Sequence, residues 1–285
     1  MTPNEKSKVL SEALPYIKQF FGKTIVIKFG GNAMIDKNLK QSFAKDLVLL
    51  KLVGMNPVVI HGGGPQINES LAKSGEKPIF QEGIRVTNKK TLEIVTNVLN
   101  EVNQQIIDLV KENGGDANSY SNEKTLSIIQ AKKLQAKEKS HDLGFVGEII
   151  GVNSSFMKHL KEDGIIPIIA PIGIDSNNKT YNINADVVAS KFAEILSAEK
   201  LVLMTNTKGV LDKNKKLITG LVPNEIERLI SNGTISDGML PKINSAVHAA
   251  MHKVNAVHII DGRVEHALLL EILTDQGVGT LIKDQ

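Results

Sequence analysis

The sequence predicts an α/β fold, an open three-layer αβα sandwich with a mainly parallel central sheet. Short apolar runs rich in β-branched residues alternate with longer segments that carry apolar residues at helical spacing. Such alternation is typical of a parallel sheet with helices on both faces. Two of the runs end in glycines, at the place where a strand would turn into a helix. No repeat with a period of about 20–50 residues is present, which argues against a solenoid or a propeller.

The order of the elements follows from the position of each apolar run. We expect strands at residues 24–28, 57–61, 126–129, 145–152, 165–170, 201–205 and 257–260. We expect helices at residues 39–53, 89–113, 185–196, 224–231, 240–253 and 264–274. A further helix starts after Pro65, because proline favours the first helical position. A loop is expected at residues 112–122 and the tip of a hairpin-like insertion at residues 132–141.

The N-terminal segment precedes the first strand and has its own helical pattern. Leu10, Leu14 and Ile17 lie on one face of a helix over residues 4–21. Pro15 inside this pattern predicts a kink near Leu14. The apolar face of such a helix needs a cover, and either its own domain or another subunit can provide it.

Composition limits the class of protein. The chain has 285 residues, which fits one large α/β domain or two lobes, and 41% hydrophobic with 23% charged residues is usual for a folded protein. The absence of Cys excludes disulfides and thiol nucleophiles, and a net charge of +3 is too small to indicate nucleic acid. No run reaches the roughly 18 apolar residues of a membrane span, and the N-terminus has no signal-peptide pattern, so we expect a cytoplasmic protein.

A polar, turn-rich stretch suggests where two lobes would meet. Residues 175–180 (DSNNKT) lie between two apolar segments. The expected domains are an N-terminal kinked helix at 1–22, an N-terminal lobe at 23–175 and a C-terminal lobe at 176–285.

Two glycine turns follow the first two strands. Gly30 and Gly31 end the first apolar run, and residues 62–64 are three glycines after the second. Ligands bind outside the carboxyl ends of strands in open α/β sheets, and glycines there let backbone N–H groups approach an anion. A single such turn often serves only the backbone, but two on consecutive strands favour a phosphate or anion cradle. Neither turn matches the dinucleotide or P-loop pattern.

Two cationic residues are candidates for binding an anion. Lys28 closes an apolar strand, where an ammonium group is costly to bury unless it meets an anion; the alternative is that it extends to solvent. Arg85 follows a glycine in an apolar setting and can form a bidentate carboxylate clamp, although a lone Arg is usually a solvated surface residue.

Polar residues before a later helix complete the candidate site. Asn184 is the expected N-cap of the helix at 185–196, which is a structural role. Asn182 and Asp186 then lie near the strand ends, where a carboxylate can organise lysines around a phosphoryl group. Lys242, taken alone, is typical of an exposed helix lysine.

Five short motifs together resemble the amino acid kinase family, in particular its members that act on N-acetyl-L-glutamate. They occur in family order over most of the chain: residues 27–31 (IKFGG), 61–64 (HGGG), 83–87 (GIRVT), 182–186 (NINAD) and 237–242 (DGMLPK). The resemblance implies the carbamate-kinase-like fold and ATP-dependent phosphorylation of the side-chain carboxylate of N-acetyl-L-glutamate, the second step of arginine biosynthesis. It also implies that the N-terminal lobe binds the substrate and the C-terminal lobe binds ATP with Mg²⁺.

The resemblance assigns roles by position. Lys28 and Lys242 would stabilise the transferring phosphoryl group, and Asp186 would hold both lysines. The residues implied to bind N-acetyl-L-glutamate are Gly63, Gly64, Arg85 and Asn182. The residues implied to bind the nucleotide are Gly30, Gly31, Thr205, Lys208 and Gly209.

One segment departs from the family pattern, and the sequence predicts neither a protein metal site nor a general base. Residues 206–208 are Asn-Thr-Lys, where several relatives have an Asp-containing segment, so the nucleotide contacts are less defined. No protein metal site is expected, because His248 and His252 are spaced i,i+4 without an acidic partner motif; Mg²⁺ would be held mainly by ATP phosphates. No general base is needed, because a carboxylate nucleophile is already ionised near neutral pH.

A second part of the resemblance concerns regulation. Family members that arginine inhibits carry an extra N-terminal helix, which joins dimers into a hexamer, and the kinked helix here matches it. The C-terminal segment starting at residue 257 resembles their effector region, so His258, Glu271 and Gly277 would contact arginine. The alternative is that these residues only pack and cap the last strands.

Three alternatives remain open. The first is another family member that acts on carbamate, glutamate or aspartate, although 285 residues leave no room for the extra domain that several of these carry. The second is a non-catalytic metabolite sensor on the same fold, against which the presence of both lysines and Asp186 argues. The third is a nicotinamide-dependent dehydrogenase, which the missing dinucleotide pattern disfavours.

Overall fold

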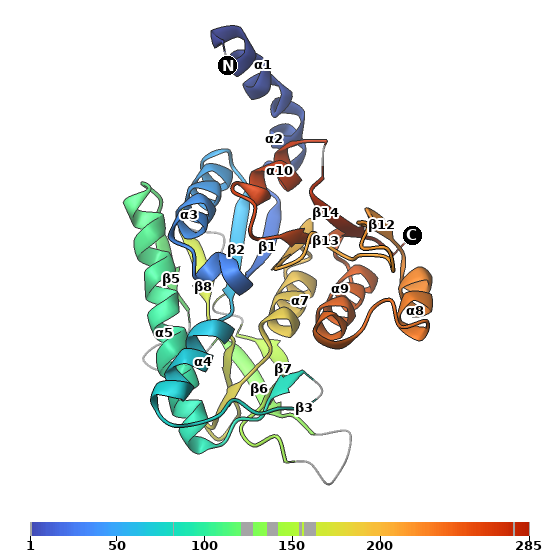
Figure 1. Ribbon diagram of the computed structural model, residues 1–285. Coiled ribbons are helices and arrows are strands. Elements are labelled where there is room, and N and C mark those ends of the chain that lie inside the picture. The colour runs from blue at the N-terminus through green and yellow to red at the C-terminus, as the bar shows by residue number, and fades with distance from the viewer. Residues whose placement is uncertain are drawn as a thin grey trace.

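The computed structural model describes residues 2–81, 83–120, 128–135, 142–153, 156, 164–275 and 277–284. Its main sheet has eight strands in the order β12-β14-β13-β11-β1-β2-β8-β5 (Figure 1). All neighbours in this sheet are parallel except β13 and β14. The strands are β1 (Thr24–Phe29), β2 (Asn56–His61), β5 (Ala117–Ser119), β8 (Ile166–Ile169), β11 (Lys200–Thr205), β12 (Gly220–Leu221), β13 (Ala256–Asp261) and β14 (Gly279–Ile282). The predicted mainly parallel sheet is confirmed.

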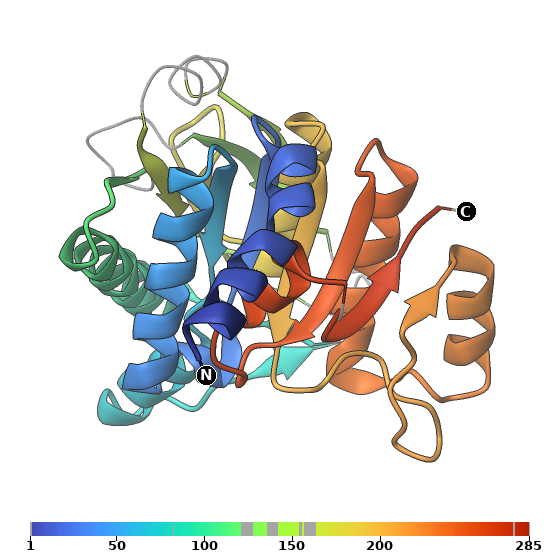
Figure 2. The same cartoon turned by 90° about the horizontal axis from the view of Figure 1, so that it is seen from above.

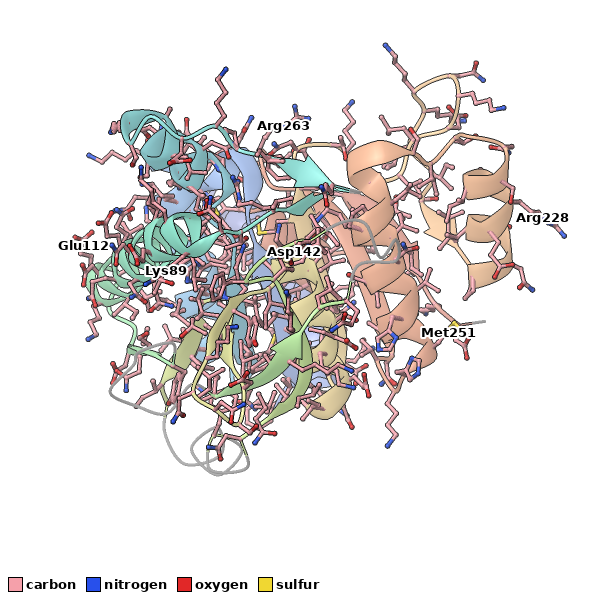
Figure 3. The ribbon with its side chains drawn as sticks, turned by 90° about the horizontal axis from the view of Figure 1, so that it is seen from below. Lys89, Glu112, Asp142, Arg228, Met251 and Arg263 are labelled. Atoms are coloured by element: carbon pink, nitrogen blue, oxygen red, sulfur yellow. The ribbon has the colours of Figure 1, made fainter. Side chains whose placement is uncertain are left out.

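Helices cover both faces of this sheet, which makes three layers (Figure 2). One layer contains α3 (Lys37–Leu52), α4 (Gly64–Lys73), α5 (Lys89–Glu112) and α10 (Ala267–Leu273). The other contains α7 (Ala185–Ile195), α8 (Pro223–Ser231) and α9 (Leu240–Met251). Charged side chains lie on the outside of these layers, as Figure 3 shows for both ends of α5 and for Arg228 on α8.

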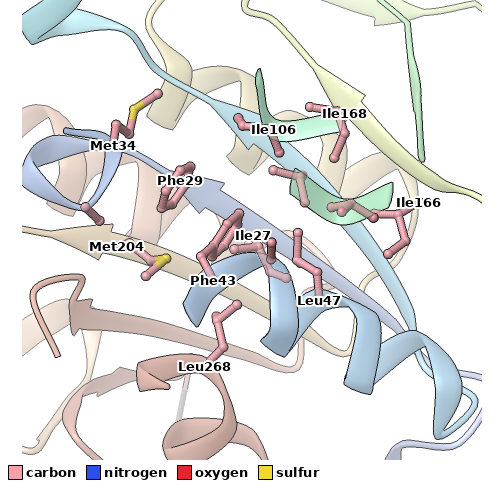
Figure 4. Packing of buried hydrophobic residues seen from close by; sticks show 14 of the residues in the cluster. Ile27, Phe29, Met34, Phe43, Leu47, Ile106, Ile166, Ile168, Met204 and Leu268 are labelled. Atoms are coloured by element: carbon pink, nitrogen blue, oxygen red, sulfur yellow. The ribbon is translucent and has the colours of Figure 1, made fainter. Parts of the chain in front are cut away.

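The alternation of side chains along β1 decides which residues meet which layer. Ile25 and Ile27 belong to the core under α3 and α5, whereas Val26 belongs to the core under α7 and α9. Figure 4 shows Ile27 and Phe29 against Phe43 of α3, where the two phenyl rings stack with centroids 3.8 Å apart. Because side chains alternate along a strand, Lys28 faces the α7/α9 layer.

A second sheet and a small hairpin lie beyond the carboxyl ends of the main strands (Figure 1). The second sheet has the order β10-β9-β6-β7, and the hairpin joins β3 to β4. Their strands are β3 (Phe80–Gln81), β4 (Ile84–Arg85), β6 (Ile129–Lys133), β7 (Gly147–Val152), β9 (Ile172–Ile174) and β10 (Thr180–Asn182). These elements form one wall of the site described below.

Several element predictions need correction. The expected loop at residues 112–122 contains β5, which is only three residues long and shows no alternation. The last helix begins at Ala267 and not at residue 264, because His266 before it has a left-handed backbone with φ 57°. Strand β6 runs through residues 129–133, into the expected hairpin tip, while residues 126–127 and 136–141 lie outside the described residues. The strands that the sequence did not predict are also short, between two and four residues: β3, β4, β9, β10, β12 and β14.

The N-terminal segment is broken as the sequence predicts. Helix α1 (Pro3–Glu12) ends one residue before Ala13, and α2 (Leu14–Phe20) begins after it. Phe20 is buried against the core, while Leu10 and Leu14 are 75% and 64% exposed. The domain itself therefore covers the end of α2, and α1 extends away from the body (Figure 1).

In the part of the chain that is described, no helix has the length and apolar character needed to cross a membrane. The cytoplasmic location stays a prediction. Residues 175–179 of the stretch 175–180 form the turn between β9 and β10, and Thr180 begins β10. Asp175 closes this turn, because its side chain accepts hydrogen bonds from the N–H groups of Asn177 and Lys179.

Candidate active site

A buried carboxylate holds two lysines at the carboxyl end of β1. Lys242 Nζ on α9 donates to Asp186 Oδ1 on α7 at 2.9 Å, and Lys28 Nζ on β1 lies 3.4 Å from the same oxygen. The three side chains are only 8–13% exposed. Asn184 caps α7 by accepting from the N–H groups of Asp186 and Val187, which fixes Asp186 in the first helical turn. Lys242 is therefore not the exposed helix lysine that its local sequence suggests.

The charges in this cluster are unequal. Burial by itself would raise the pKa of Asp186, but the charges of Lys242 and Lys28 outweigh it and lower the pKa to about 2. Burial lowers the pKa of Lys242 to about 8, against the opposing effect of Asp186. Near neutral pH one carboxylate thus faces two lysines, and the excess positive charge is suited to an anion.

The glycine turn after β1 leaves room for the lysine. A Cβ atom at Gly30 would collide with Lys28 Nζ, and one at Gly31 would collide with Asn206 Oδ1. Gly31 also has φ +73°, which favours glycine. The N–H of Asn32 donates to Asn206 Oδ1 at 2.7 Å. The turn after β1 is thereby joined to the loop after β11.

The predicted nucleotide residues lie in these two connected segments. Thr205 ends β11, and its carbonyl accepts from the N–H of Gly262 at 2.8 Å. Gly209 has φ +141°, and a Cβ there would press on Thr280. Lys208 lies between them in the sequence. The pKa of Asp261 is lowered mainly by its hydrogen bond with Arg263, and the charge of Lys208 lowers it further. The contact through Asn206 was not predicted; only its place beside Thr205 in the chain could have indicated it.

A pocket of about 210 Å³ opens beside the lysines. Its lining includes Lys28, residues 62–64, Arg85, Asn182 and Asp186, so the predicted substrate residues do converge. Gly63 precedes α4, whose N-terminus favours a negative charge. The pocket is smaller than the roughly 300–1,000 Å³ typical of drug-sized ligands, which suits a small metabolite.

Arg85 has a free donor in this pocket. Its Nη2 donates to Asn68 Oδ1 at 2.7 Å, and its guanidinium lies 4.7 Å from the centre of the Phe80 ring. Its Nη1 is buried without a hydrogen-bond partner among the described residues. Buried donors are rarely left unpaired, so this nitrogen indicates a place for an anionic oxygen.

A buried threonine connects the two polar residues of the pocket. Thr87 Oγ1 donates to the carbonyl of Arg85 at 2.9 Å and accepts from Asn182 Nδ2 at 3.2 Å. Thr87 has no exposed surface. The side chain of Asn182 and the backbone of Arg85 are therefore held in one arrangement. The sequence showed Thr87 only as the last residue of a motif.

A larger hollow of about 940 Å³ lies between α7 and α9. It shares five lining residues with the small pocket, Gly83, Ile84, Val146, Ile183 and Asn184, but Arg85 and the Lys–Asp–Lys cluster do not line it. The small pocket is the candidate active site, because Lys28, Arg85 and Asp186 converge there.

The sequence profile of the Amino acid kinase family matches residues 23–261. The chain belongs to the amino acid kinase family. The acetylglutamate kinase of Aromatoleum aromaticum is 56% identical over 292 residues, which cover 100% of this chain and 97% of that protein. The acetylglutamate kinase of Methylobacillus flagellatus is 57% identical over 287 residues, with coverage of 99% and 97%.

A solved structure extends the family comparison. N-acetylglutamate synthase from Neisseria gonorrhoeae, complexed with coenzyme A and N-acetyl-glutamate, has a TM-score of 0.88 at 26% identity and covers 98% of this chain. Its complex with coenzyme A and L-arginine has a TM-score of 0.84 at 25% identity. This chain spans 63–65% of the length of that synthase.

The C-terminal residues that the family resemblance singled out also lie together. His258 Nδ1 on β13 donates to Glu271 Oε1 on α10, and Glu271 Oε2 accepts from the N–H of Val278 at 2.8 Å. A Cβ atom at Gly277 would lie 3.3 Å from Glu271 Oε1. Burial lowers the pKa of His258, which favours its neutral form.

Lys200 belongs to this C-terminal cluster and was not predicted. Its Nζ lies 3.0 Å from His258 Nε2 and 4.9 Å from the centre of the Phe20 ring on α2. The cluster is therefore in contact with the N-terminal segment. The residue is the first of β11, where an ordinary strand-edge lysine gives no functional signal in the sequence.

Proposed function

We propose that this amino acid kinase transfers the γ-phosphoryl group of ATP to the side-chain carboxylate of N-acetyl-L-glutamate, forming N-acetyl-L-glutamyl 5-phosphate in the second step of arginine biosynthesis. One observation carries the proposal: a Lys–Asp–Lys cluster with excess positive charge lies beside a small pocket with an unpaired Arg85 donor. Identity of 56–57% over the full length to relatives named acetylglutamate kinase supports the choice of substrate.

The substrate side of the reaction depends on orientation. Arg85 and Asn182 bind the α-carboxylate and its polar neighbours, and the N–H groups of Gly63 and Gly64 receive the reacting end. A side-chain carboxylate near neutral pH is ionised and needs no general base. Binding it in line with the γ-phosphorus supplies much of the rate enhancement.

The transfer itself exchanges one P–O bond for another. A carboxylate oxygen forms a bond to the γ-phosphorus, the bond to the bridging oxygen breaks, and ADP leaves with that electron pair. Lys28 and Lys242 stabilise the charge on the phosphoryl oxygens, and Asp186 keeps both ammonium groups in place.

We place the nucleotide on the side of the two lysines that is opposite the substrate. We place ATP mainly in the C-terminal lobe at 176–285, against Thr205, Lys208 and Gly209. It also lies against Gly30 and Gly31, which follow β1 in the lobe at 23–175, and that lobe holds the substrate. Among the described residues no three His, Asp or Glu side chains gather to hold a metal ion. Mg²⁺ bound by the phosphates supplies additional neutralising charge.

Substrate choice is tested by ATP consumption with N-acetyl-L-glutamate, L-glutamate, L-aspartate and carbamate in parallel. N-acetyl-L-glutamate is expected to give the highest kcat/KM. Turnover that is faster with carbamate or a free amino acid would contradict the proposal, and the absence of turnover with all four would favour a metabolite sensor.

Arg85→Lys is expected to raise KM for N-acetyl-L-glutamate about tenfold or more and to leave KM for ATP nearly unchanged. Lysine keeps the charge but loses the planar pair of donors that suits a carboxylate. Steady-state kinetics with each substrate varied in turn measure both values. Arg228→Lys, on the exposed face of α8, is the matched control and is expected to behave as wild type. An equal rise in both KM values would contradict the role of Arg85.

We also propose that arginine inhibits the enzyme at the C-terminal cluster. Glu271 offers a buried carboxylate that would bind the guanidinium, and backbone N–H groups near Gly277 would bind the α-carboxylate. The fold relative that binds L-arginine supports this choice of ligand. Inhibition requires that arginine prefer a less active arrangement of the lobes. The uncovered face of α1, with Leu10 75% exposed, supports assembly of dimers into a hexamer through the N-terminal helices.

Removal of residues 1–12 is expected to blunt arginine inhibition and to reduce the hexamer to dimers, while kcat survives. The deletion takes away α1 and leaves Phe20 of α2 in the core. Light scattering gives the oligomeric state, and an arginine titration gives the half-inhibitory concentration. Glu271→Gln is expected to weaken inhibition without changing the oligomer. A full-length dimer that is insensitive to arginine would contradict the regulatory proposal and leave the kinase proposal intact.

A further inference from the structure

A histidine without exposed surface lies directly before the second glycine turn. His61 ends β2 and is 0% exposed, and its Nδ1 lies 2.8 Å from the carbonyl oxygen of Gly62. Its Nε2 lies 3.0 Å from Nδ2 of Asn103, which is itself 1% exposed on α5. The same Nδ2 donates to the carbonyl of Ile168 on β8 at 3.1 Å. The catalytic steps described above do not use either side chain.

These contacts select one tautomer of the ring. Carbonyl oxygens only accept hydrogen bonds, so Nδ1 of His61 carries the proton and Nδ2 of Asn103 is directed to both Ile168 and the ring. Nε2 is then the acceptor for Asn103. Burial lowers the pKa of His61 to about 4, so the ring is neutral at pH 7 and keeps this arrangement.

The contact to Gly62 controls a donor on the opposite side of the peptide. The carbonyl of Gly62 and the N–H of Gly63 belong to one planar trans peptide, and they point in opposite directions. The N–H of Gly62 is already held by the carbonyl of Phe29 at 2.8 Å. Consecutive glycines leave the next peptide free to rotate, so the ring of His61 supplies a constraint that the backbone lacks.

Helix α5 supports the turn at a second point. A Cβ atom at Gly63 would approach within 2.8 Å of Cδ2 of Leu99, which lines the pocket and lies one helical turn before Asn103. Leu99 limits the position of the glycine turn. Asn103 orients the turn indirectly, because it holds His61, which contacts the Gly62 carbonyl. Leu99 and Asn103 come from the same face of α5.

We propose that His61 and Asn103 are positioning residues, which hold the Gly62–Gly63 peptide so that the Gly63 N–H is directed into the pocket as a donor for a substrate oxygen. This inference rests on the proposed function, because it deepens the part that Gly63 has in binding the reacting carboxylate. A donor fixed before the reaction needs no reorganisation as charge develops. The neutral ring also makes the contact independent of pH between about 5 and 9, since its pKa is about 4.

Asn103→Leu tests the relay, because it removes the donor to His61 and keeps a similar volume. We expect kcat/KM for N-acetyl-L-glutamate to fall about tenfold or more, and less than the roughly 10²–10³-fold seen when an oxyanion donor itself is removed. KM for ATP is expected to stay within about twofold. Ile107→Val, which trims a buried side chain one turn further along α5, is the matched control and is expected to keep wild-type kinetics.

Nitrogen NMR of histidine-labelled protein reports the tautomer of His61, which a loss of packing alone would not change. In wild type we expect His61 as the Nδ1–H tautomer at pH 7 and unchanged at pH 5.5, with its signal assigned by its absence in His61→Gln. In Asn103→Leu we expect a shift towards the Nε2–H tautomer.

The outcomes separate the two proposals. A wild-type enzyme that does not phosphorylate N-acetyl-L-glutamate contradicts the proposed function. A wild-type His61 with its proton on Nε2 overturns the relay even if the variant fails to fold. Wild-type kcat/KM in Asn103→Leu, or an equal loss in Ile107→Val, also overturns it.

Discussion

Lys242→Met is expected to lower kcat about 100-fold or more and to change KM for ATP and for N-acetyl-L-glutamate by much less. The lysine is 2.9 Å from Asp186 and is aligned before substrate binds, so its contribution is greatest where charge develops in transfer. Methionine keeps much of the aliphatic volume in a side chain that is only 8% exposed. Lys28→Met is expected to have a similar effect.

Initial-rate kinetics with each substrate varied separate the effect on kcat from the effect on KM. Lys191→Met is the matched control, because it also removes a lysine that is paired with a carboxylate. Lys191 Nζ on α7 lies 2.9 Å from Glu194 Oε1, and neither residue lines the small pocket. The control is expected to remain within about threefold of wild type, because this partly buried pair contacts none of the three residues of the Lys–Asp–Lys cluster. Near-wild-type kcat in both Lys28→Met and Lys242→Met would show that the lysines have another role.

The sheet and its helices could be predicted because their signals are local and long. The apolar run that became β1 and the helical pattern that became α5 extend over 6 and 24 residues, enough for a period to be recognised. Strands of two to four residues carry no such period. The three-residue β5 forms because β8 offers it a parallel edge, and that partner lies more than 40 residues away along the chain.

The residues of the candidate site that could be predicted are those next to a sequence signal, such as a strand end or a helix start. Lys28 and the glycines mark strand ends, and the motif at 182–186 marks a helix start. The partners Asn103, Asn206 and Lys200 lie in ordinary helix, loop and strand positions and gain their contacts only through folding. Asn103 meets His61 across 42 residues, and Asn206 meets Asn32 across 174, so no local pattern could indicate either pair.

The pH dependence of kcat/KM tests the charges of Lys242 and Asp186. In the wild-type enzyme kcat/KM is expected to be level from about pH 6 and to fall as pH rises through about 8, where the free enzyme loses the proton of Lys242. Asp186, with a pKa of about 2, stays ionised over this whole range and adds no acidic limb.

Asp186→Asn is expected to lower kcat about 100-fold at pH 8 and to move the basic limb of kcat/KM to lower pH. The charge of Asp186 raises the pKa of Lys242 against burial, so its removal lets that pKa fall below about 8 and leaves a smaller fraction of the lysine charged. The two lysines also lose the oxygen that held them, so the rate loss exceeds what deprotonation alone explains. At lower pH part of the lost rate should therefore return, as Lys242 regains its proton.

The control for this variant is Asp175→Asn in the turn between β9 and β10. This substitution removes a carboxylate that lies outside the Lys–Asp–Lys cluster and accepts a hydrogen bond from Tyr181 Oη at 3.0 Å. Asp175→Asn is expected to keep both the kcat of wild type and the pH of the basic limb of kcat/KM. Breaking a buried pair also costs stability, so thermal unfolding of Asp186→Asn must show a folded protein at the assay temperature. A basic limb that stays in place in folded Asp186→Asn would mean that a group other than Lys242 sets it, because the pKa of Lys242 must change when the neighbouring carboxylate charge is removed.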